Sequence, residues 1–93
     1  MTDTNAFRRT AIVAEIHAER DRQDAQWGGP AHDDEHYGDD WMEFIQHQLT
    51  RYDADMDDNQ SVNIARRRLI KIAALAVAGV ESIDRKTHSE AKP

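Results

Sequence analysis

The stretch that decides the fold is Val62–Lys86, whose sequence is VNIARRRLIKIAALAVAGVESIDRK. Its apolar residues recur every three or four positions, which is typical of an α-helix that begins near Ser61. One apolar stripe consists of Leu69, Ile72, Ala73, Ala76, Val80 and Ile83, and a second stripe beside it consists of Ile70, Ala74 and Val77. Two short neighbouring helices cannot cover such a wide apolar sector, so we expect a homodimer or a larger homo-oligomer.

Another helix is predicted at the start of the chain. Thr4 or Asn5 can cap it, and Ile12 and Ile16 lie on its apolar side. It is expected to end near Gln26, because the segment WGGP at 27–30 combines two glycines with a proline and interrupts a helix.

A middle helix is predicted after a polar segment. Asp39 or Asp40 can serve as its N-cap, with Glu43 in position for a capping box. Its packing face would consist of Trp41, Phe44, Ile45, Gln48, Leu49 and Tyr52. The acidic segment Asp53–Gln60 has no apolar pattern and is expected to be a mobile connection.

The predicted fold is therefore one all-α domain over residues 1–93, with three main helices forming a helical bundle completed by oligomerisation. Residues 1–4 and 87–93 are expected to be disordered, as chain ends often are. A chain of this length is near the size at which a single core is only marginally sufficient.

Composition narrows the class of protein. The chain has no cysteine, which excludes disulfides and thiolate metal sites and fits a reducing cytoplasm. Its net charge of -6 argues against a nucleic-acid partner, since such proteins normally carry a basic face. The first residues, MTDTNAFRR, do not form a signal peptide, and the apolar run Ile72–Val80 is too short to span a bilayer. We expect a cytoplasmic protein with no membrane partner.

Several carboxylates occupy positions where apolar residues are expected. Glu15 and Glu19 lie one turn apart on the first helix, and Gln23 continues their row. Glu81 and Asp84 continue the apolar stripes of the last helix. Two acids one turn apart repel by roughly a few tenths of a kcal/mol even when exposed, and buried carboxylates need a cation or a hydrogen-bonding partner.

Two interpretations of these acids remain open. They can form a Mg²⁺ site, because hard cations prefer carboxylate oxygens and a bundle collects ligands from facing helices. They can equally form ordinary salt bridges, Glu15 with Arg22 or Glu81 with Arg85.

The central segment His32-Asp33-Asp34-Glu35-His36 contains five possible ligands. A zinc site would require a helix that brings His32 and His36 onto one face, and the neighbouring glycines and proline disfavour one. A structured loop that supplies a metal ligand, a general base or a substrate contact is one alternative. An acidic, solvated loop is the other.

The aromatic and basic residues each have two interpretations, one of which is contact with a nucleotide. Trp27 and Trp41 flank the central segment and can stack a base or seal a small core, and Trp41 lies on the packing face of its helix. Arg66-Arg67-Arg68 with Lys71 can contact phosphates or balance the acidic segment 53–58. A Gly-rich phosphate loop is absent, and no serine has a plausible triad setting.

These motifs resemble those of a known family. The blocks are Glu15-x3-Glu19-Arg20-x-Arg22-Gln23, Trp27-Gly28, His32-Asp33-Asp34-x-His36 and the helix Ala73–Arg85. Together they resemble the dATP/dGTP diphosphohydrolase-like domains of phage and prophage genomes, over roughly Glu15–Lys86 apart from the loop after Tyr52. That family is similar to the wider MazG-like all-α nucleoside triphosphate pyrophosphohydrolases.

The resemblance implies a helical oligomer that binds Mg²⁺, or Mn²⁺ in its place, and splits the α–β phosphate bond of a (d)NTP into a monophosphate and pyrophosphate. It implies metal-binding roles for Glu15, Glu19, Glu81 and Asp84, with Glu19 activating water. The wider group uses E-x-x-E followed by E-x-x-D at the start of a later helix. Here the first pair is E-x3-E, and Glu81-x-x-Asp84 falls near the end of its helix, while Asp40-x-x-Glu43 also has the spacing.

The leading hypothesis is a Mg²⁺-dependent nucleotide pyrophosphohydrolase in the cytoplasm, a bacterial host's if the protein is phage-encoded. The expected substrate-binding residues are Arg22, Gln23, Trp27, His32, Asp33, Asp34, His36 and Lys71, with Arg20 also able to take up charge on pyrophosphate. The alternative is a protein that binds a nucleotide or cyclic nucleotide and sequesters it without hydrolysis. A third possibility is a helical protein that binds a protein partner and no small ligand.

Overall fold

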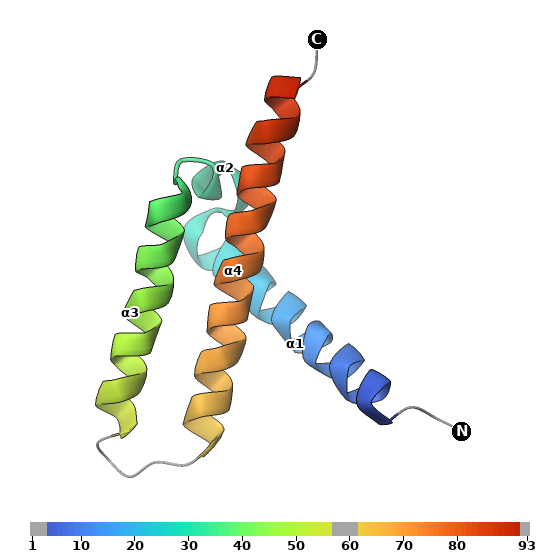
Figure 1. Cartoon of the computed structure of the whole chain (residues 1–93), viewed down its shortest axis with the longest axis vertical. Helices are drawn as coiled ribbons and strands as arrows, with labels where there is room; N and C mark the ends of the chain where they lie inside the picture. The colour runs from blue at the N-terminus through green and yellow to red at the C-terminus, as the bar shows by residue number, and fades with distance from the viewer. Residues whose placement is uncertain (1–3, 57–61, 92–93) are drawn as a thin grey trace.

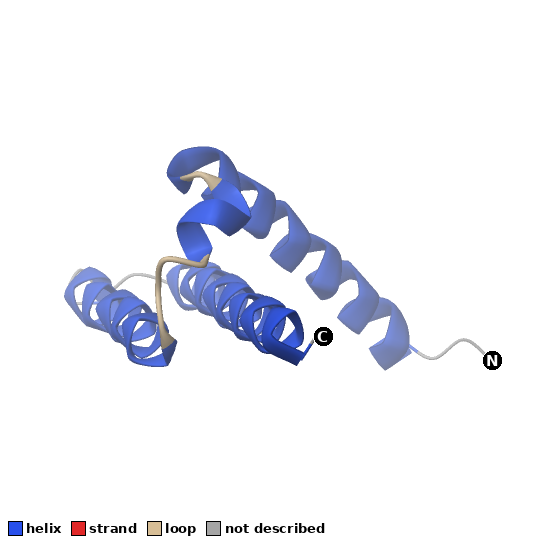
Figure 2. Ribbon diagram, turned by 90° about the horizontal axis from the view of Figure 1, so that it is seen from above, coloured by secondary structure: helices blue, strands red, loops and turns tan. Residues whose placement is uncertain are grey.

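Four helices build the molecule, which is a computed structural model that describes residues 4–56 and 62–91. They are α1 (Thr4–Trp27), α2 (Gly29–Asp33), α3 (Gly38–Met56) and α4 (Val62–Ala91). α3 and α4 run antiparallel side by side and form one layer (Figure 1). α1 and α2 lie on one face of this layer (Figure 2). The predicted all-α class is confirmed.

The core lies where α3 meets α4. Trp41 of α3 is 5% exposed and packs against Leu75 and Ala78 of α4, with Phe44 and Ile45 at its edge. Gly79 allows this close approach, because a Cβ atom there would lie 3.0 Å from Trp41 Cγ and 3.2 Å from its Cδ2. The small residues of α4 therefore let one large indole ring fill the space between the helices.

The buried face of α4 differs from the predicted stripes. Leu75, Ala78 and Ser82 belong to neither stripe, yet all three are buried. Lys71 is half-buried on this same face. Because α1 and α2 bring polar groups to this side of α4, a partly polar face points inward.

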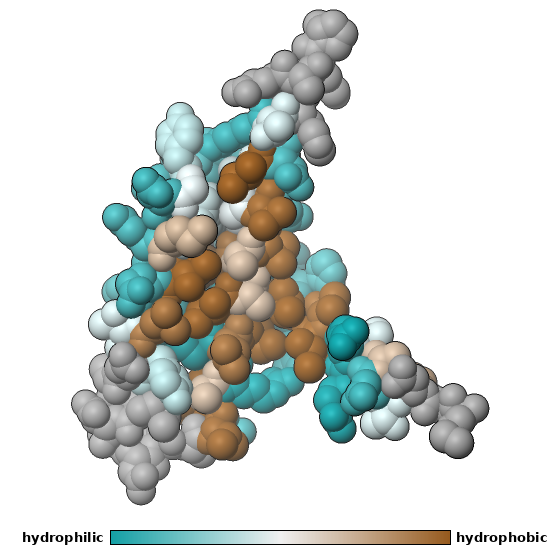
Figure 3. Space-filling model, in the orientation of Figure 1, coloured by the Kyte–Doolittle hydropathy of each residue, from teal (hydrophilic) through white to brown (hydrophobic). Residues whose placement is uncertain are grey.

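The first apolar stripe instead faces outward. Leu69, Val80 and Ile83 are 64%, 59% and 48% exposed, and Met42 of α3 is 68% exposed. Figure 3 shows apolar side chains gathered over the face that α3 and α4 present to the viewer. A single copy of the chain leaves this surface uncovered.

The break between α1 and α2 is confirmed. Gly28 and Gly29 have φ angles of 111° and 69°, a left-handed backbone conformation that side chains with a Cβ rarely adopt. The expectation that the segment after Pro30 is a loop is wrong in part, because Gly29–Asp33 forms one helical turn with the proline in its first turn. Proline fits there since the first helical N–H groups have no intrahelical acceptor.

The start of α3 also differs from the prediction. Tyr37 precedes the helix, and its backbone N–H donates to Asp40 Oδ2 at 2.8 Å. Asp40 therefore reaches back from inside the first turn, and neither the predicted N-cap at Asp39 or Asp40 nor the predicted capping contact of Glu43 is seen.

Both ends of α1 and the start of α4 lie close to the predicted positions, whereas α3 and α4 extend further than predicted. α4 continues to Ala91, beyond the end predicted near Lys86, although residues from 87 on were expected to be disordered. Of the segment expected to be a mobile connection, the first residues belong to α3, which ends at Met56, and 57–60 lie outside the described residues. No described helix combines the length and the apolar composition that crossing a bilayer requires.

The first half of α1 projects away from the bundle (Figure 1). Residues 4–11 are all exposed, including Phe7 at 66%. The second half carries the residues that face α2 and α4.

Replacing Gly79 by alanine tests the contact with Trp41. The new Cβ would crowd the indole, and such overpacking costs about 1–3 kcal/mol, only partly offset by the roughly 1 kcal/mol gain in helix propensity. We expect the melting temperature, followed by circular dichroism, to fall by several degrees.

Gly38→Ala is the matched control, because a Cβ there meets nothing within 4 Å and the residue has no left-handed φ. It should leave the melting temperature unchanged or raise it. Equal effects of the two substitutions would contradict a tight Gly79–Trp41 contact.

Candidate functional site

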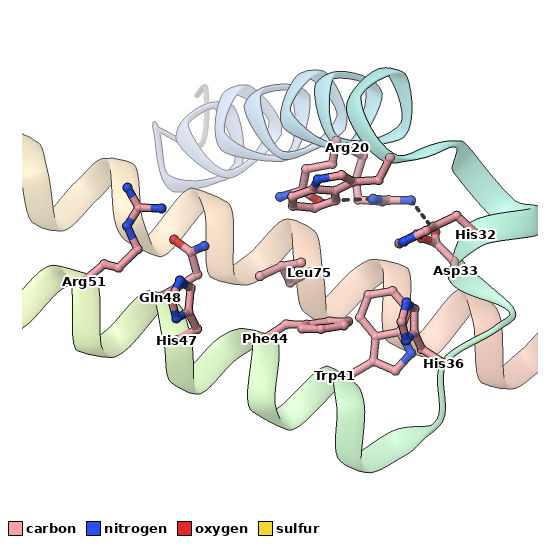
Figure 4. A pocket seen from close by; sticks show the side chains of 12 residues that line it. Arg20, His32, Asp33, His36, Trp41, Phe44, His47, Gln48, Arg51 and Leu75 are labelled. Carbon is pink, nitrogen blue, oxygen red and sulfur yellow. Dashed lines mark hydrogen bonds and ion pairs between the residues drawn. The ribbon is translucent and has the colours of Figure 1, made fainter.

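A cavity of about 400 Å³ lies between α1, α2 and α3, with α4 at its back. Figure 4 shows α1 on one side, α3 on the other and α2 at one end. The lining residues are Arg20, Gln23, Trp27, His32, Asp33, His36, Trp41, Phe44, His47, Gln48, Arg51 and Leu75. Aromatic rings, amides and basic groups predominate, and the lining contains a single carboxylate.

Arg20 is the polar centre of the site. The residue is 9% exposed, and its Nη2 lies 3.2 Å from Asp33 Oδ2 and 2.8 Å from Asp24 Oδ1. Its Nη1 donates to Gln23 Oε1 at 3.2 Å, and its Nε lies 3.8 Å from Glu81 Oε1. One guanidinium thus links α1 to α2 and α4. Removing one partner of such a buried pair costs about 3–5 kcal/mol, since the other charge is left uncompensated.

Asp34 makes a second polar link, from the end of α2 to α4. Ser82 Oγ donates to Asp34 Oδ1 at 2.8 Å and also lies 3.2 Å from the carbonyl oxygen of Asp33. Arg85 Nη2 donates to Asp34 Oδ1 at 2.9 Å. The hydrogen bond from Arg85, followed by that from Ser82, holds the pKa of Asp34 below its usual value.

Lys86 holds the chain just beyond this link. Its Nζ hydrogen-bonds to the carbonyl oxygen of His36 and lies 4.2 Å from the centre of the Tyr37 ring. The face of α4 that carries Ser82 and Lys86 therefore fixes the predicted ligand segment in place.

The aromatic wall of the cavity is built around His36. Its ring centre lies 4.9 Å from that of His32, 5.0 Å from that of Phe44 and 6.0 Å from that of Trp41. Trp41 belongs to the core, as one of the two interpretations of this residue predicted. Trp27 is 44% exposed at the rim, and its ring lies roughly parallel to that of His32 at 6.5 Å.

The four predicted metal ligands do not converge. Glu15 is exposed and forms a bidentate ion pair with Arg66, whose Nη1 donates to Glu15 Oε1 at 2.8 Å. Hydrogen bonding to Arg66 lowers the pKa of Glu15. Glu81 lies near Arg20, and Asp84 is exposed. Salt bridges form as the second interpretation predicted, but Glu15 pairs with Arg66 rather than Arg22, and Glu81 with Arg20 rather than Arg85.

Glu19 is also held by its neighbours. It accepts from Arg22 Nε at 3.0 Å and from Gln23 Nε2 at 3.2 Å. Burial alone would raise the pKa of Glu19. The hydrogen bonds and charge of Arg22 outweigh burial, together with the charge of Lys71 and the hydrogen bond from Gln23, so that the pKa is lowered. Both ends of the Gln23 amide are thus occupied within α1.

These donors do not fit a metal centre as they stand. Within residues 4–56 and 62–91, no three His, Asp or Glu side chains are grouped so that they could share an ion. His32 and His36 lie together, with Asp33 Oδ1 3.5 Å from His32 Nδ1 and Asp40 Oδ2 3.7 Å from His36 Nδ1, but these described side chains do not surround one point that could hold an ion. Binding of Mg²⁺ or Mn²⁺ stays a prediction, and the geometry supports no catalytic step through a metal.

Positive charge gathers at the end of the cavity away from α2. Arg51 lines the cavity, and Arg68 Nη1 donates to the neighbouring Gln48 Oε1 at 2.7 Å. Lys71 lies nearby on α4, and its pKa is lowered, first by burial and then by the charge of Arg22. The charge of Glu19 acts in the opposite direction, and the charges of Arg68 and Arg51 lower the pKa further. The basic run 66–68 is therefore divided, because Arg66 pairs with Glu15 of α1 and Arg68 bonds to Gln48, which lines the cavity.

Sequence reasoning named seven of the twelve lining residues and missed five. The seven are Arg20, Gln23, Trp27, His32, Asp33, His36 and Trp41, while Arg22, Asp34 and Lys71 are not among the lining residues. The five whose roles were missed are Phe44, His47, Gln48, Arg51 and Leu75. Phe44, Gln48 and Arg51 recur at helical spacing on α3, and this was the available signal.

Comparison with known proteins adds no family: scans against protein-family models, curated proteins and solved structures found no match.

The Asp34 link predicts a dependence of stability on pH. Because the pKa of Asp34 is lower in the folded state, its contribution is present above the ordinary value of 3.8 and is lost as pH falls through the folded-state pKa. Asp34→Asn should therefore be less stable than the wild type at neutral pH, and the difference in melting temperature should shrink below pH 3.8.

The control is Glu43→Gln, which removes an exposed acid with no ion pair to a described residue. It should track the wild type throughout. A constant offset between Asp34→Asn and the wild type across the same range would contradict the ion-paired state of Asp34.

Proposed function

We propose that this chain binds a nucleotide in the cavity between its four helices. The observation that carries the proposal is the cavity's lining, which joins aromatic rings to amides and basic side chains in a space of about 400 Å³. Small-molecule sites are typically concave, of this order of volume, and largely apolar with a few polar groups that orient the ligand.

The chemistry of the lining matches the parts of a nucleotide. Base rings stack on aromatic side chains, and Phe44, His36 and Trp27 offer such surfaces. Phosphates require positive charge, which Arg51 supplies. The single lining carboxylate, Asp33, is 5% exposed and bound to Arg20, so it does not repel an anion strongly.

The sequence resemblance supports the same ligand class. The blocks resemble dATP/dGTP diphosphohydrolase-like phage domains and, more widely, MazG-like enzymes, all of which handle nucleoside triphosphates. On the basis of this resemblance we place the protein in the cytoplasm. If a phage encodes the protein, this is the cytoplasm of the bacterial host.

Sequestration without cleavage fits the geometry better than hydrolysis. Glu15 and Glu19 are engaged by arginines, and the predicted metal ligands do not converge. Hydrolysis of a (d)NTP with Mg²⁺ remains the second proposal, and it rests on the resemblance and on the exposed carboxylates Glu81 and Asp84 of α4.

Tryptophan fluorescence offers a direct test of binding, because both tryptophans of the chain line the cavity. Titration with a panel of ribo- and deoxynucleotides, including cyclic ones, should change the tryptophan emission, and the change should saturate as the nucleotide concentration rises. The change should persist in EDTA, and Phe44→Leu should weaken it, while Asp21→Asn on the exposed side of α1 should not.

The fate of the ligand separates the two proposals. Chromatography after incubation with Mg²⁺ or Mn²⁺ should return the nucleotide unchanged. Release of pyrophosphate, abolished by Glu81→Gln, would establish the hydrolase instead. Absence of binding to every nucleotide of the panel would overturn both.

We also propose that a second copy covers the apolar stripe of α4. Leu69, Ala76, Val80 and Ile83 form an exposed row without charges, and such a row can pack against itself across a two-fold axis. The apolar core buried within one chain is small, and Leu75 is its one large aliphatic member among the described residues. Burial of the stripe would supply the apolar contacts that a short chain needs.

Light scattering tests this assembly. The wild type should have the mass of a dimer or larger oligomer, and Val80→Glu should shift it toward the monomer, because a charge on the stripe cannot be desolvated without a partner. Ala25→Glu, which adds the same charge on exposed α1, should leave the mass unchanged. A wild type that stays monomeric at high concentration would contradict the proposal.

A further inference from the structure

The cavity has two chemically different ends. In Figure 4, His36, Trp41 and Phe44 lie toward α2, and Arg51 lies at the opposite end of the row along α3. The ten residue steps from Trp41 to Arg51 correspond to about 15 Å of helix at 1.5 Å per residue. An extended ligand with a base, a sugar and several phosphates can lie along this length.

Among the described residues, positive charge is paired with more carboxylates at one end of the cavity than at the other. Near α2, Arg20 is surrounded by Asp24, Asp33 and Glu81. At the far end, neither Arg51 nor Lys71 makes an ion pair with a carboxylate in the described part of the chain.

The acids and bases around Lys71 come from three helices. Glu19 and Arg22 of α1 are paired with each other, and Arg51 of α3 and Arg68 of α4 act on Lys71 as like charges. Lys71 is not among the residues that line the cavity, but it stands one turn before Leu75, which is, and its charge interacts with that of Arg51. Cations that converge from separate helices can bind a polyanion through charge-assisted hydrogen bonds.

We propose that Arg51 and Lys71 form a phosphate subsite, so that a nucleoside polyphosphate lies with its base against the aromatic end near α2 and its terminal phosphates at the far end. This rests on the proposed function and adds an orientation to it. A monophosphate anchored by its base would fall short of Arg51, and affinity should therefore rise with the number of phosphates.

The test compares ligands that differ only in phosphate number. The probes are deoxyadenosine and deoxyguanosine with their mono-, di- and triphosphates, measured by equilibrium dialysis in EDTA with purified full chain. Affinity of the wild type should increase from nucleoside to triphosphate. Arg51→Gln and Lys71→Gln should each weaken triphosphate binding about tenfold, the effect of one lost charge-assisted contact, and leave nucleoside binding unchanged.

Two controls separate orientation from general damage. Phe44→Leu should weaken all members of a series by the same factor, since it alters the end that holds the base. Arg67→Gln removes an exposed charge of the same basic run outside the cavity lining and should change nothing. Circular dichroism verifies that each variant is folded.

The outcomes distinguish this inference from the proposed function. If nucleotides bind but Arg51→Gln and Lys71→Gln weaken nucleoside and triphosphate equally, or have no effect, the phosphate subsite is overturned and nucleotide binding stands. A phosphate-dependent loss in Arg85→Gln instead would place the phosphates near α2 and also overturn it. If the wild type binds none of the probes, both the phosphate subsite and the proposed nucleotide binding are overturned.

Discussion

The fold depends on a buried arginine that holds three helices together. Arg20 lies among Asp24, Asp33 and Glu81, so that its charge is compensated by carboxylates from α1, α2 and α4. A helix of one turn, such as α2, is not stable alone, because nucleation costs more than its few hydrogen bonds return. The ion pairs of Arg20 and Asp34 therefore keep α2 helical and close one end of the cavity.

Much of the architecture could be predicted from local chemistry. Apolar periodicity identified the long helices, and the glycines at 28 and 29 marked the break after α1, as their positive φ angles confirm. The inward face of α4 could not be predicted in this way. Periodicity ranks faces by apolarity, whereas Ser82 points inward because Asp34 accepts its hydrogen bond.

The same limit applies to the candidate site. Unusual acids drew attention to Glu15 and Glu19, but a pattern of acids does not reveal which arginine lies within reach of each. Arg66 is far from Glu15 in the sequence and forms its ion pair only because α1 crosses α4. The central segment was a better guide, since His32, Asp33 and His36 all line the cavity.

The two halves of α1 differ in what supports them. Its second half is bound through Arg20, whereas the side chains of residues 4–11 are exposed. A helical segment that buries little of its surface is marginal in water at this length. Amide hydrogen exchange should therefore be graded along one continuous helix, fast around Phe7 and slow around Arg20. The N-terminal turns would then unfold and refold locally in the free chain, and they would become fully ordered only on contact with another surface.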